Sequence, residues 1–210
     1  MNEYTKLIAK KLLEINAIKL NVETPFTWAS GWKSPIYCDN RLSLSYPEIR
    51  SFIKQQLVTT IQKNFNEVEA IAGVATAGIP QGALVADALR IPFIYVRSKP
   101  KGHGMENMIE GKVTPGQKVV VIEDLVSTGG SSLLAVEVLK KSNFMVLGMV
   151  SIFTYGFPLA ENNFRNENVK LISLSNYNEL IEEALRLNYV TQDQISSLKK
   201  WREHPGEWGK

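Results

Sequence analysis

The residues from 119 to 132, VVVIEDLVSTGGSS, place the strongest constraint on how this chain can fold. An apolar run leads directly into two neighbouring carboxylates, Glu123 and Asp124, and a turn rich in glycine and hydroxyl groups follows them. Buried strands do not usually end in such a pair, because neighbouring carboxylates repel each other and are costly to remove from water. The pattern therefore predicts a buried strand over residues 118–122 that delivers two acidic side chains to a site that uses them.

Composition limits the class of protein. The chain has 210 residues, of which 44 % are hydrophobic, and this suits one globular domain with a substantial core. The net charge of +3 is too small to indicate a nucleic-acid partner. A single cysteine, Cys38, excludes an intramolecular disulfide and a cysteine-cluster metal site, and it suits a reducing compartment. No apolar run is as long as a membrane span, so we expect a cytoplasmic protein with no membrane partner.

Strand-like and helix-like segments alternate through the middle of the chain. We expect helices at 46–65, 79–89 and 131–141, and strands at 70–74, 91–96, 118–122, 144–153 and 169–173. This alternation, with strands that are apolar throughout, indicates a mostly parallel sheet with helices on both faces. Ligands of such sheets bind at the carboxyl ends of the strands. Three segments follow such ends, namely GVATAG at 73–78, RSKPKGHG at 97–104 and EDLVSTGG at 123–130.

Both ends of the chain carry helical patterns. Near the N-terminus, several apolar residues share one helical face, which predicts an amphipathic helix rather than a signal peptide: Tyr4, Leu7, Ile8, Leu12 and Ile15. Near the C-terminus, Thr191 and Gln194 have the spacing of a capping box that begins another helix. We expect Trp201 and Trp208 to pack against the protein rather than to contact a ligand.

The turn after the acid pair has the composition of a phosphate-binding loop. It offers successive backbone N–H groups, two glycines and four hydroxyls, and it leads into a helix N-terminus. Neither a Walker P-loop nor a dinucleotide-binding GxGxxG pattern is present. Carboxylates suit the hydroxyls of a sugar and a positive charge that develops on it. We interpret the segment as a sugar-phosphate site. An acidic strand end before an ordinary turn is the alternative, and we favour that reading only for EDL taken alone.

Residues 119–132 resemble the phosphoribosyl pyrophosphate (PRPP) motif of type I phosphoribosyltransferases. That motif consists of four hydrophobic residues, two acids, a few variable residues and a loop rich in Thr, Ser and Gly. The resemblance implies the α/β type I phosphoribosyltransferase fold, with a central, mostly parallel sheet flanked by helices and a small N-terminal hood that reads the base. The chain is expected to be a single domain over 1–210, with the hood built mainly from about residues 1–45 plus C-terminal elements.

Further segments are similar to those of orotate phosphoribosyltransferases, above all to the version found in Gram-positive bacteria. Residues 95–112, YVRSKPKGHGMENMIEGK, resemble the mobile catalytic loop, and residues 26–41, FTWASGWKSPIYCDNR, resemble the base-side segment. GVATAGIP at 73–80 and VSIFTY at 150–155 extend the match over most of the chain. The implied reaction transfers the phosphoribosyl group from PRPP to orotate, giving orotidine 5′-monophosphate and pyrophosphate, with Mg²⁺, in de novo pyrimidine (UMP) biosynthesis.

The resemblance also implies roles for individual residues. The carboxylates of the acid pair would hold the ribose hydroxyls, and Lys101, His103 and Asp124 are expected to be catalytic. The expected PRPP-binding residues are Arg97, Lys101, His103, Glu123, Asp124, Leu125, Val126, Ser127, Thr128, Gly129, Gly130 and Ser131. The expected orotate-binding residues are Ser127, Tyr37 and Cys38. Since the loop of this family reaches the neighbouring subunit's site, a homodimer with shared active sites is implied.

For the basic segment 97–104 the alternative is a solvated surface loop, which is common.

Mg²⁺ prefers oxygen ligands and keeps several waters, so we expect the pyrophosphate, the sugar and water to supply most of its ligands. No dedicated all-protein metal site is expected, and Asp124, with Glu123, is expected to be the protein group nearest the metal.

Several positions depart from the better-known enteric members of the family. Those members have lysine at the positions of Ala29 and Ala77, an orotate-binding arginine at the position of Thr154, and a further loop lysine where this chain has Ser98. Which group binds the orotate carboxylate is therefore open, with Lys33, Arg41 and backbone N–H groups as candidates. Two other functions are also open: a phosphoribosyltransferase for a purine base, and a non-catalytic regulatory relative that binds a nucleotide or nucleic acid.

Overall fold

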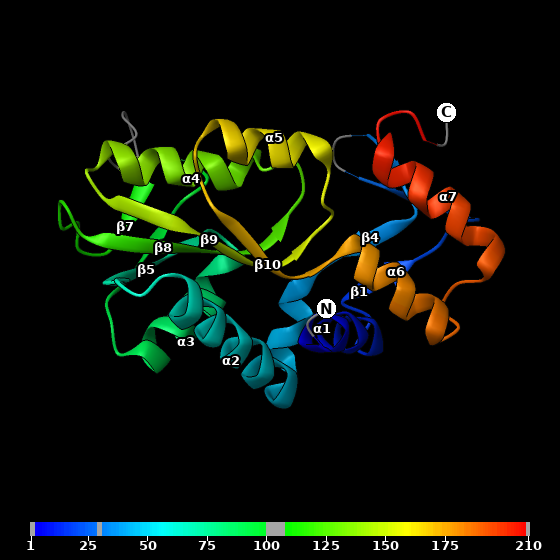
Figure 1. Ribbon diagram of the computed structural model, residues 1–210, viewed down its shortest axis with the longest axis horizontal. Helices are drawn as coiled ribbons and strands as arrows, with labels where there is room; N and C mark the ends of the chain where they lie inside the picture. The colour runs from blue at the N-terminus through cyan, green and yellow to red at the C-terminus, as the bar shows by residue number, and fades with distance from the viewer. Residues whose placement is uncertain (1–2, 29–30, 100–107, 209–210) are drawn as a thin grey trace.

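The computed structural model describes residues 3–28, 31–99 and 108–208 (Figure 1). Within these residues, the main sheet has six strands in the order β10 (Leu171–Asn176), β9 (Met145–Thr154), β8 (Lys118–Val126), β5 (Ala70–Val74), β6 (Phe93–Val96) and β7 (Ile109–Glu110). Every neighbouring pair is parallel except β6 with β7, which is antiparallel. The predicted mostly parallel sheet is therefore confirmed.

Helices cover both faces of this sheet, as Figure 1 shows. One face carries α2 (Pro47–Asn64) and α3 (Gly78–Leu89), and the other carries α4 (Gly130–Lys141) and α5 (Pro158–Asn166). Because both faces are covered, all residues of β5 are buried. Pro47 and Pro158 begin their helices, where a missing N–H costs no helical hydrogen bond.

Segments from both ends of the chain lie together at the right of Figure 1. They are α1 (Glu3–Glu14), the 3₁₀ helix η1 (Asn40–Ser45), α6 (Tyr177–Arg186), α7 (Gln192–Glu203), and two antiparallel pairs, β1 (Ile18–Leu20) with β4 (Ile36–Cys38) and β2 (Phe26–Thr27) with β3 (Lys33–Ser34). The capping box of Thr191 and Gln194 is present at the start of α7. The sequence predicted one domain with a hood built mainly from about residues 1–45 plus C-terminal elements, and this division stays a prediction.

An aromatic cluster joins α7 to the rest of the protein. Trp201 is completely buried, and its ring centroid lies 5.2 Å from that of Tyr177 and 5.3 Å from that of Phe157. The rings of Trp28 and Tyr155 each lie 5.6 Å from it. Rings at these separations bury large apolar areas and add favourable edge contacts. Trp201 is therefore a packing residue, as the sequence predicted.

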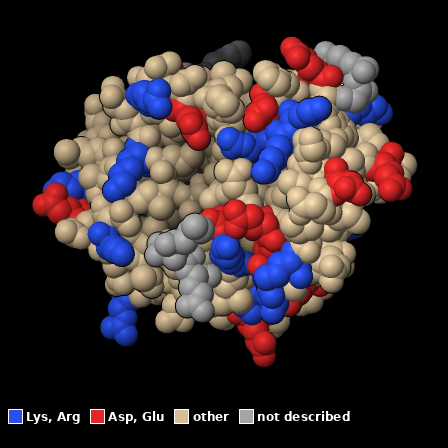
Figure 2. All heavy atoms as spheres, turned by 45° about the vertical axis from the view of Figure 1, so that its right-hand side comes forward, with Lys and Arg blue, Asp and Glu red and all other residues tan. Residues whose placement is uncertain are grey.

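The surface carries charges of both signs. On the face shown in Figure 2, Lys and Arg side chains are interspersed with Asp and Glu side chains, in keeping with the small net charge of +3. In the part of the chain that the structure describes, no helix has both the length and the hydropathy needed to cross a membrane.

Strand β8 differs from the expectation. It continues to Val126 rather than ending at residue 122, so Glu123 and Asp124 lie inside the strand and not after it. Parallel pairing with β9 holds this extension, in which Glu123 lies opposite Ser151 and Val126 opposite Thr154. The prediction was wrong here because it took the first carboxylate as the strand end, whereas long-range pairing overrides the low strand preference of acidic residues. Helix α5 had no predicted counterpart.

The buried carboxylate of Glu183 on α6 gives a test of this packing. Arg186 donates to it from Nε at 2.9 Å and also from NH2, and these two hydrogen bonds hold the pKa of Glu183 below its usual range. We expect Glu183→Gln to lower the free energy of unfolding at pH 7 by roughly 1 kcal/mol, a modest value because the Arg186 side chain is 60 % exposed. A lowered carboxyl pKa stabilises the fold above the unfolded-state pKa, about 4.3 for glutamate. That stabilisation is lost as the pH falls through the folded-state pKa.

Urea denaturation of wild type and Glu183→Gln at pH 7, 5 and 3.5 would measure this difference, which should shrink toward the lowest pH. Glu182→Gln on the same helix is the matched control, since its carboxylate pairs with Lys6 while 60 % exposed. Equal losses for the two variants at pH 7 would contradict a special contribution from the buried Glu183.

Candidate active site

The acid pair of β8 is built with two different environments. Successive strand residues start toward opposite faces of the sheet, but the carboxyl groups of Glu123 and Asp124 remain close enough to interact with each other through a side-chain hydrogen bond. Glu123 is 5 % exposed, and its Oε2 accepts a hydrogen bond of 2.9 Å from Ser132 Oγ at the start of α4. The other oxygen, Oε1, accepts from the backbone N–H of Asp124 at 3.1 Å. Asp124 is half-buried and is therefore the more accessible residue of the pair.

Burial also sets the protonation of the pair. Loss of water raises the pKa of Glu123 well above its usual range, and the neighbouring charge of Asp124 adds to the shift. Burial raises the pKa of Asp124 as well. Sugar hydroxyls that donate to Asp124, or a cation beside it, would favour its charged form. Such a ligand would therefore lower the cost of keeping Asp124 charged.

The backbone around Asp124 is fixed from two sides. Asn40 of η1 donates from Nδ2 to the Asp124 carbonyl at 2.7 Å. Gly78, the first residue of α3, packs so closely that a Cβ there would lie 2.5 Å from the Ile122 carbonyl oxygen. This contact brings the short loop of residues 75–77 beside the acid pair. Ala77 in that loop contributes no charged side chain and no side-chain cap to α3.

The loop between β8 and α4 is the segment that the sequence predicted to bind a phosphate. Gly129 has φ of +86°, a left-handed conformation that favours glycine, and a Cβ there would lie 2.9 Å from the Phe164 ring. The loop is held by Asn163 of α5, which donates from Nδ2 to the Thr128 carbonyl at 3.0 Å. No side chain caps the N-terminus of α4. Its first backbone N–H groups are therefore free to bind an anion.

The other residues of this segment are placed as follows. Ser127 and Thr128 are half-buried, and Gly130 and Ser131 are exposed. Leu125 and Val126 belong to the end of β8, where they pair with β9, and Val126 is buried.

A cavity of about 290 Å³ adjoins this loop and is large enough to hold a small planar ring such as a nucleobase, so we name it the base-sized cavity. Its lining residues are Thr27, Trp28, Tyr37, Cys38, Leu125, Ser127 and Tyr155. The three residues expected to contact orotate are all among them. Of the others, Leu125 was expected to bind PRPP, whereas Thr27, Trp28 and Tyr155 had no expected role, although Tyr155 follows the carboxyl end of β9 directly and carried that signal. The rings of Trp28 and Tyr155 lie 5.2 Å apart and form one wall.

The polar groups of the cavity are neutral. Burial raises the pKa of the Cys38 thiol well above its usual value, and the protonated thiol lies 3.4 Å from Asn40 Oδ1, to which it donates. Burial likewise raises the pKa of Tyr155. Reactive cysteines are thiolates with lowered pKa values, so Cys38 lacks the character of a nucleophile. The cavity is suited to holding a ring and not to attacking it.

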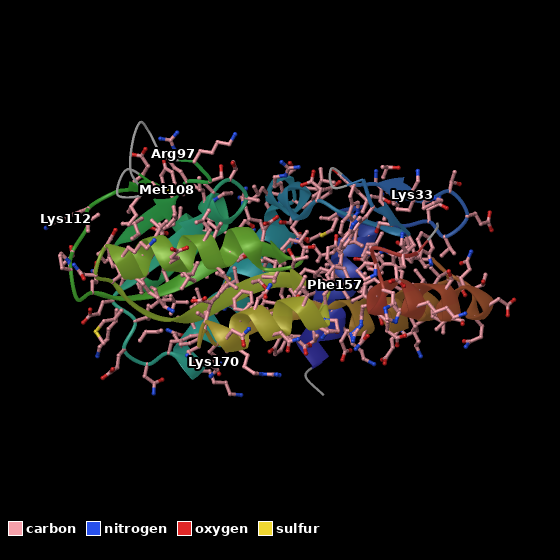
Figure 3. All side chains as sticks on the ribbon, turned by 90° about the horizontal axis from the view of Figure 1, so that it is seen from above. Lys33, Arg97, Met108, Lys112, Phe157 and Lys170 are labelled. Carbon is pink, nitrogen blue, oxygen red and sulfur yellow. The ribbon has the colours of Figure 1, made fainter. Side chains whose placement is uncertain are left out.

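Two basic residues, Arg97 and Lys99, follow the end of β6, which is separated from β8 by β5 in the sheet. Arg97 NH1 lies 3.5 Å from Glu110 Oε1 of β7. The backbone N–H of Arg97 donates to the Met108 carbonyl at 2.8 Å, and the two residues are labelled side by side in Figure 3. Lys99 is exposed. Lys101 and His103, the expected catalytic residues of the loop, lie outside the described residues, as does Ala29.

The Thr154 side chain makes hydrogen bonds within the protein. Its Oγ1 donates to the Val126 carbonyl at 3.1 Å and accepts from the Gly156 N–H at 3.1 Å. It lines a different cavity of about 610 Å³, toward α5 and α6, which shares Tyr155 with the base-sized cavity.

Comparison with known proteins agrees with this geometry. The phosphoribosyl transferase domain family matches residues 43–177 of this chain. An orotate phosphoribosyltransferase of Cytophaga hutchinsonii is 60 % identical over 207 residues, which is 99 % of each chain. Another from Listeria innocua serovar 6a is 56 % identical over 205 residues, or 98 % of each chain.

Among solved structures, the crystal structure of orotate phosphoribosyltransferase from Aeropyrum pernix has a TM-score of 0.75 and 29 % identity. The match covers 88 % of this chain and 99 % of that one. The predicted type I phosphoribosyltransferase fold is thereby confirmed. Identity of this extent over nearly the whole length, together with the shared domain and fold, shows that the chain belongs to the orotate phosphoribosyltransferase family.

Proposed function

We propose that this protein transfers the phosphoribosyl group from PRPP to orotate, giving orotidine 5′-monophosphate and pyrophosphate, in pyrimidine biosynthesis. One observation carries the proposal above all. The segment that begins with the acid pair also lines the base-sized cavity, through Leu125 and Ser127. A ribose bound at Asp124 would therefore have its anomeric carbon next to a ring held in that cavity, which is the arrangement that transfer to a base requires.

The residues take distinct roles in this proposal. Asp124 accepts hydrogen bonds from the ribose hydroxyls, while Glu123 supports the segment from inside through Ser132. The 5′-phosphate binds the uncapped backbone N–H groups at the start of α4, among residues 128–131. The orotate ring lies in the cavity beside Tyr37, Cys38 and the Trp28–Tyr155 wall.

The chemistry needs positioning and charge neutralisation. A ring nitrogen of orotate forms a bond to the anomeric carbon, and the bond from that carbon to pyrophosphate oxygen breaks, with its electron pair leaving on pyrophosphate. The carbon passes through an oxocarbenium-like state, which the Asp124 carboxylate stabilises. Arg97, Lys101 and His103 neutralise the charge that develops on pyrophosphate, and closure of their loop excludes water.

Mg²⁺ forms part of the proposal and would neutralise charge on the pyrophosphate. The described residues contain no group of three or more His, Cys, Asp or Glu placed to hold a metal. Asp124 offers one reachable carboxylate, which suits a hard cation that keeps most of its waters. We propose that PRPP and water supply most of the ligands.

We also propose a cytoplasmic homodimer in which Lys101 and His103 act in the neighbouring subunit's site. Leu42 and Tyr46 support an interface near the site. They are large apolar residues, 39 % and 44 % exposed, on and just after η1, the helix whose Asn40 holds the Asp124 carbonyl. Contiguous exposed apolar surface marks sites of association, and these two residues would contribute to such a surface.

The reaction and the shared site can be tested together. We expect wild type to consume orotate in an ultraviolet assay with PRPP and Mg²⁺, whereas Lys101→Ala and Asp124→Asn should each be nearly inactive. A mixture of the two variants, after subunit exchange, should recover about a quarter of wild-type activity, because about half of the dimers are hybrids with one intact site of two.

The control mixture pairs Lys101→Ala with a double variant that carries both changes, since no combination of these subunits makes an intact site. Recovery in the control, or none in the test mixture, would contradict a loop that acts in trans. Turnover of adenine or guanine instead of orotate would contradict the proposed base.

The role of the phosphate loop predicts a second result. Gly129→Ala should raise the KM for PRPP about tenfold or more, because its Cβ would push against Phe164 and shift N–H groups that must be positioned closely. Gly116→Ala is the matched control, since Gly116 has a similar φ of +82° but open space around it. Steady-state kinetics at saturating orotate would measure both variants. Equal KM values would contradict the assignment of this loop to PRPP.

A further inference from the structure

Among the described residues, the side chains that line the base-sized cavity supply no positive charge for the carboxylate of orotate. The cavity's lining residues in the described part of the chain are all uncharged side chains, and the pKa values of Cys38 and Tyr155 keep these two neutral. Orotate, however, is an anion whose ring carries a carboxylate. A carboxylate that leaves water without a partner costs several times more than a neutral polar group. Backbone N–H groups can pair with a carboxylate, but a cation within reach of the cavity would favour orotate over an uncharged pyrimidine more strongly.

Lys33 is positioned to supply that cation. It lies opposite Thr27 in the β2–β3 pair, so the two side chains share one face of the hairpin. Lys33 Nζ donates to Thr27 Oγ1 at 2.9 Å, and Thr27 lines the cavity. The ammonium group is thus separated from the cavity by a single hydroxyl. The flexible four-carbon stem of lysine allows the group to swing from this hydroxyl toward a stronger acceptor.

The charge of Lys33 is also uncompensated. Within the described residues, no carboxylate forms an ion pair with it, and its hydrogen-bond partner is the neutral Thr27. Arg41, the other cation of this region, is bound to Asp39 through Nε at 2.6 Å and through NH2 at 3.0 Å. Releasing Arg41 would break this charged pair, whereas Lys33 would exchange only a neutral partner for a charged one.

We propose that Lys33 binds the carboxylate of orotate and thereby sets the preference of the site for a carboxylated pyrimidine. Thr27 holds the ammonium group at the rim of the cavity in the free protein. This assignment rests on the proposed function and adds to it the residue that distinguishes orotate from an uncharged base.

The test compares two nucleotides that differ only in this carboxylate. Orotidine 5′-monophosphate carries it, and uridine 5′-monophosphate does not. By calorimetry we expect Lys33→Ala to weaken binding of orotidine 5′-monophosphate on the order of tenfold, as for loss of a hydrogen bond to a charged group, and to leave uridine 5′-monophosphate unchanged. Lys33→Arg should retain most of the discrimination because it keeps the charge. Lys170→Ala, which removes a lysine far from Lys33 in Figure 3, should change neither affinity.

Two outcomes would overturn the assignment. Equal weakening of both nucleotides by Lys33→Ala would mean that Lys33 supports the hairpin and does not read the carboxylate. Unchanged binding of orotidine 5′-monophosphate would remove Lys33 from recognition altogether. If wild type still consumes orotate in either case, the proposed function stands and only this inference fails. A wild-type protein that consumes no orotate and binds both nucleotides equally would overturn the two together.

Discussion

The parallel pairing of β8 between β5 and β9 is the constraint on which the site depends. It carries two carboxylates to the edge of the sheet as part of the strand, with Glu123 opposite Ser151 and Leu125 opposite Phe153. Glu123 is buried and accepts a hydrogen bond from Ser132, while Asp124 is half-buried. The ladder thus gives Glu123 and Asp124 different surroundings, and the roles proposed for them, support for Glu123 and ligand binding for Asp124, rest on that difference.

The aromatic cluster around Trp201 connects distant parts of the chain to the same site. Trp28 comes from the N-terminal segments and Tyr155 from the end of β9, and both line the base-sized cavity while packing on Trp201 of α7. The shape of the cavity therefore depends on a helix that contributes no lining residue to it. This is a general consequence of close packing, since a buried ring can move only if its neighbours move as well.

The sequence predicted the elements with strong local signals and missed those that depend on tertiary contacts. The strand Ala70–Val74 was predicted with its observed bounds, because an apolar run ends there at a glycine-containing turn. The end of β8 was wrong, because the pairing with β9 is not visible locally. Tyr37, Cys38 and Ser127, which the sequence predicted to bind orotate, all line the cavity, and their role stays a prediction. Thr27 had no predicted role, because its two-residue strand has no periodicity to detect. Lys101 and His103 lie outside the described residues.

The acid pair also links stability to function. Burial raises the pKa of both carboxylates, so keeping them charged at neutral pH costs free energy in the unliganded protein. A ligand that donates hydrogen bonds to Asp124, or a cation held by such a ligand, removes part of that cost when it binds. Lys33 lies near the cavity and donates a hydrogen bond to the neutral Thr27, so a carboxylate there would gain a charged partner. A substrate with hydroxyls at one end and a carboxylate at the other would satisfy both groups, so these residues favour the ligand that carries both features over one that carries either alone.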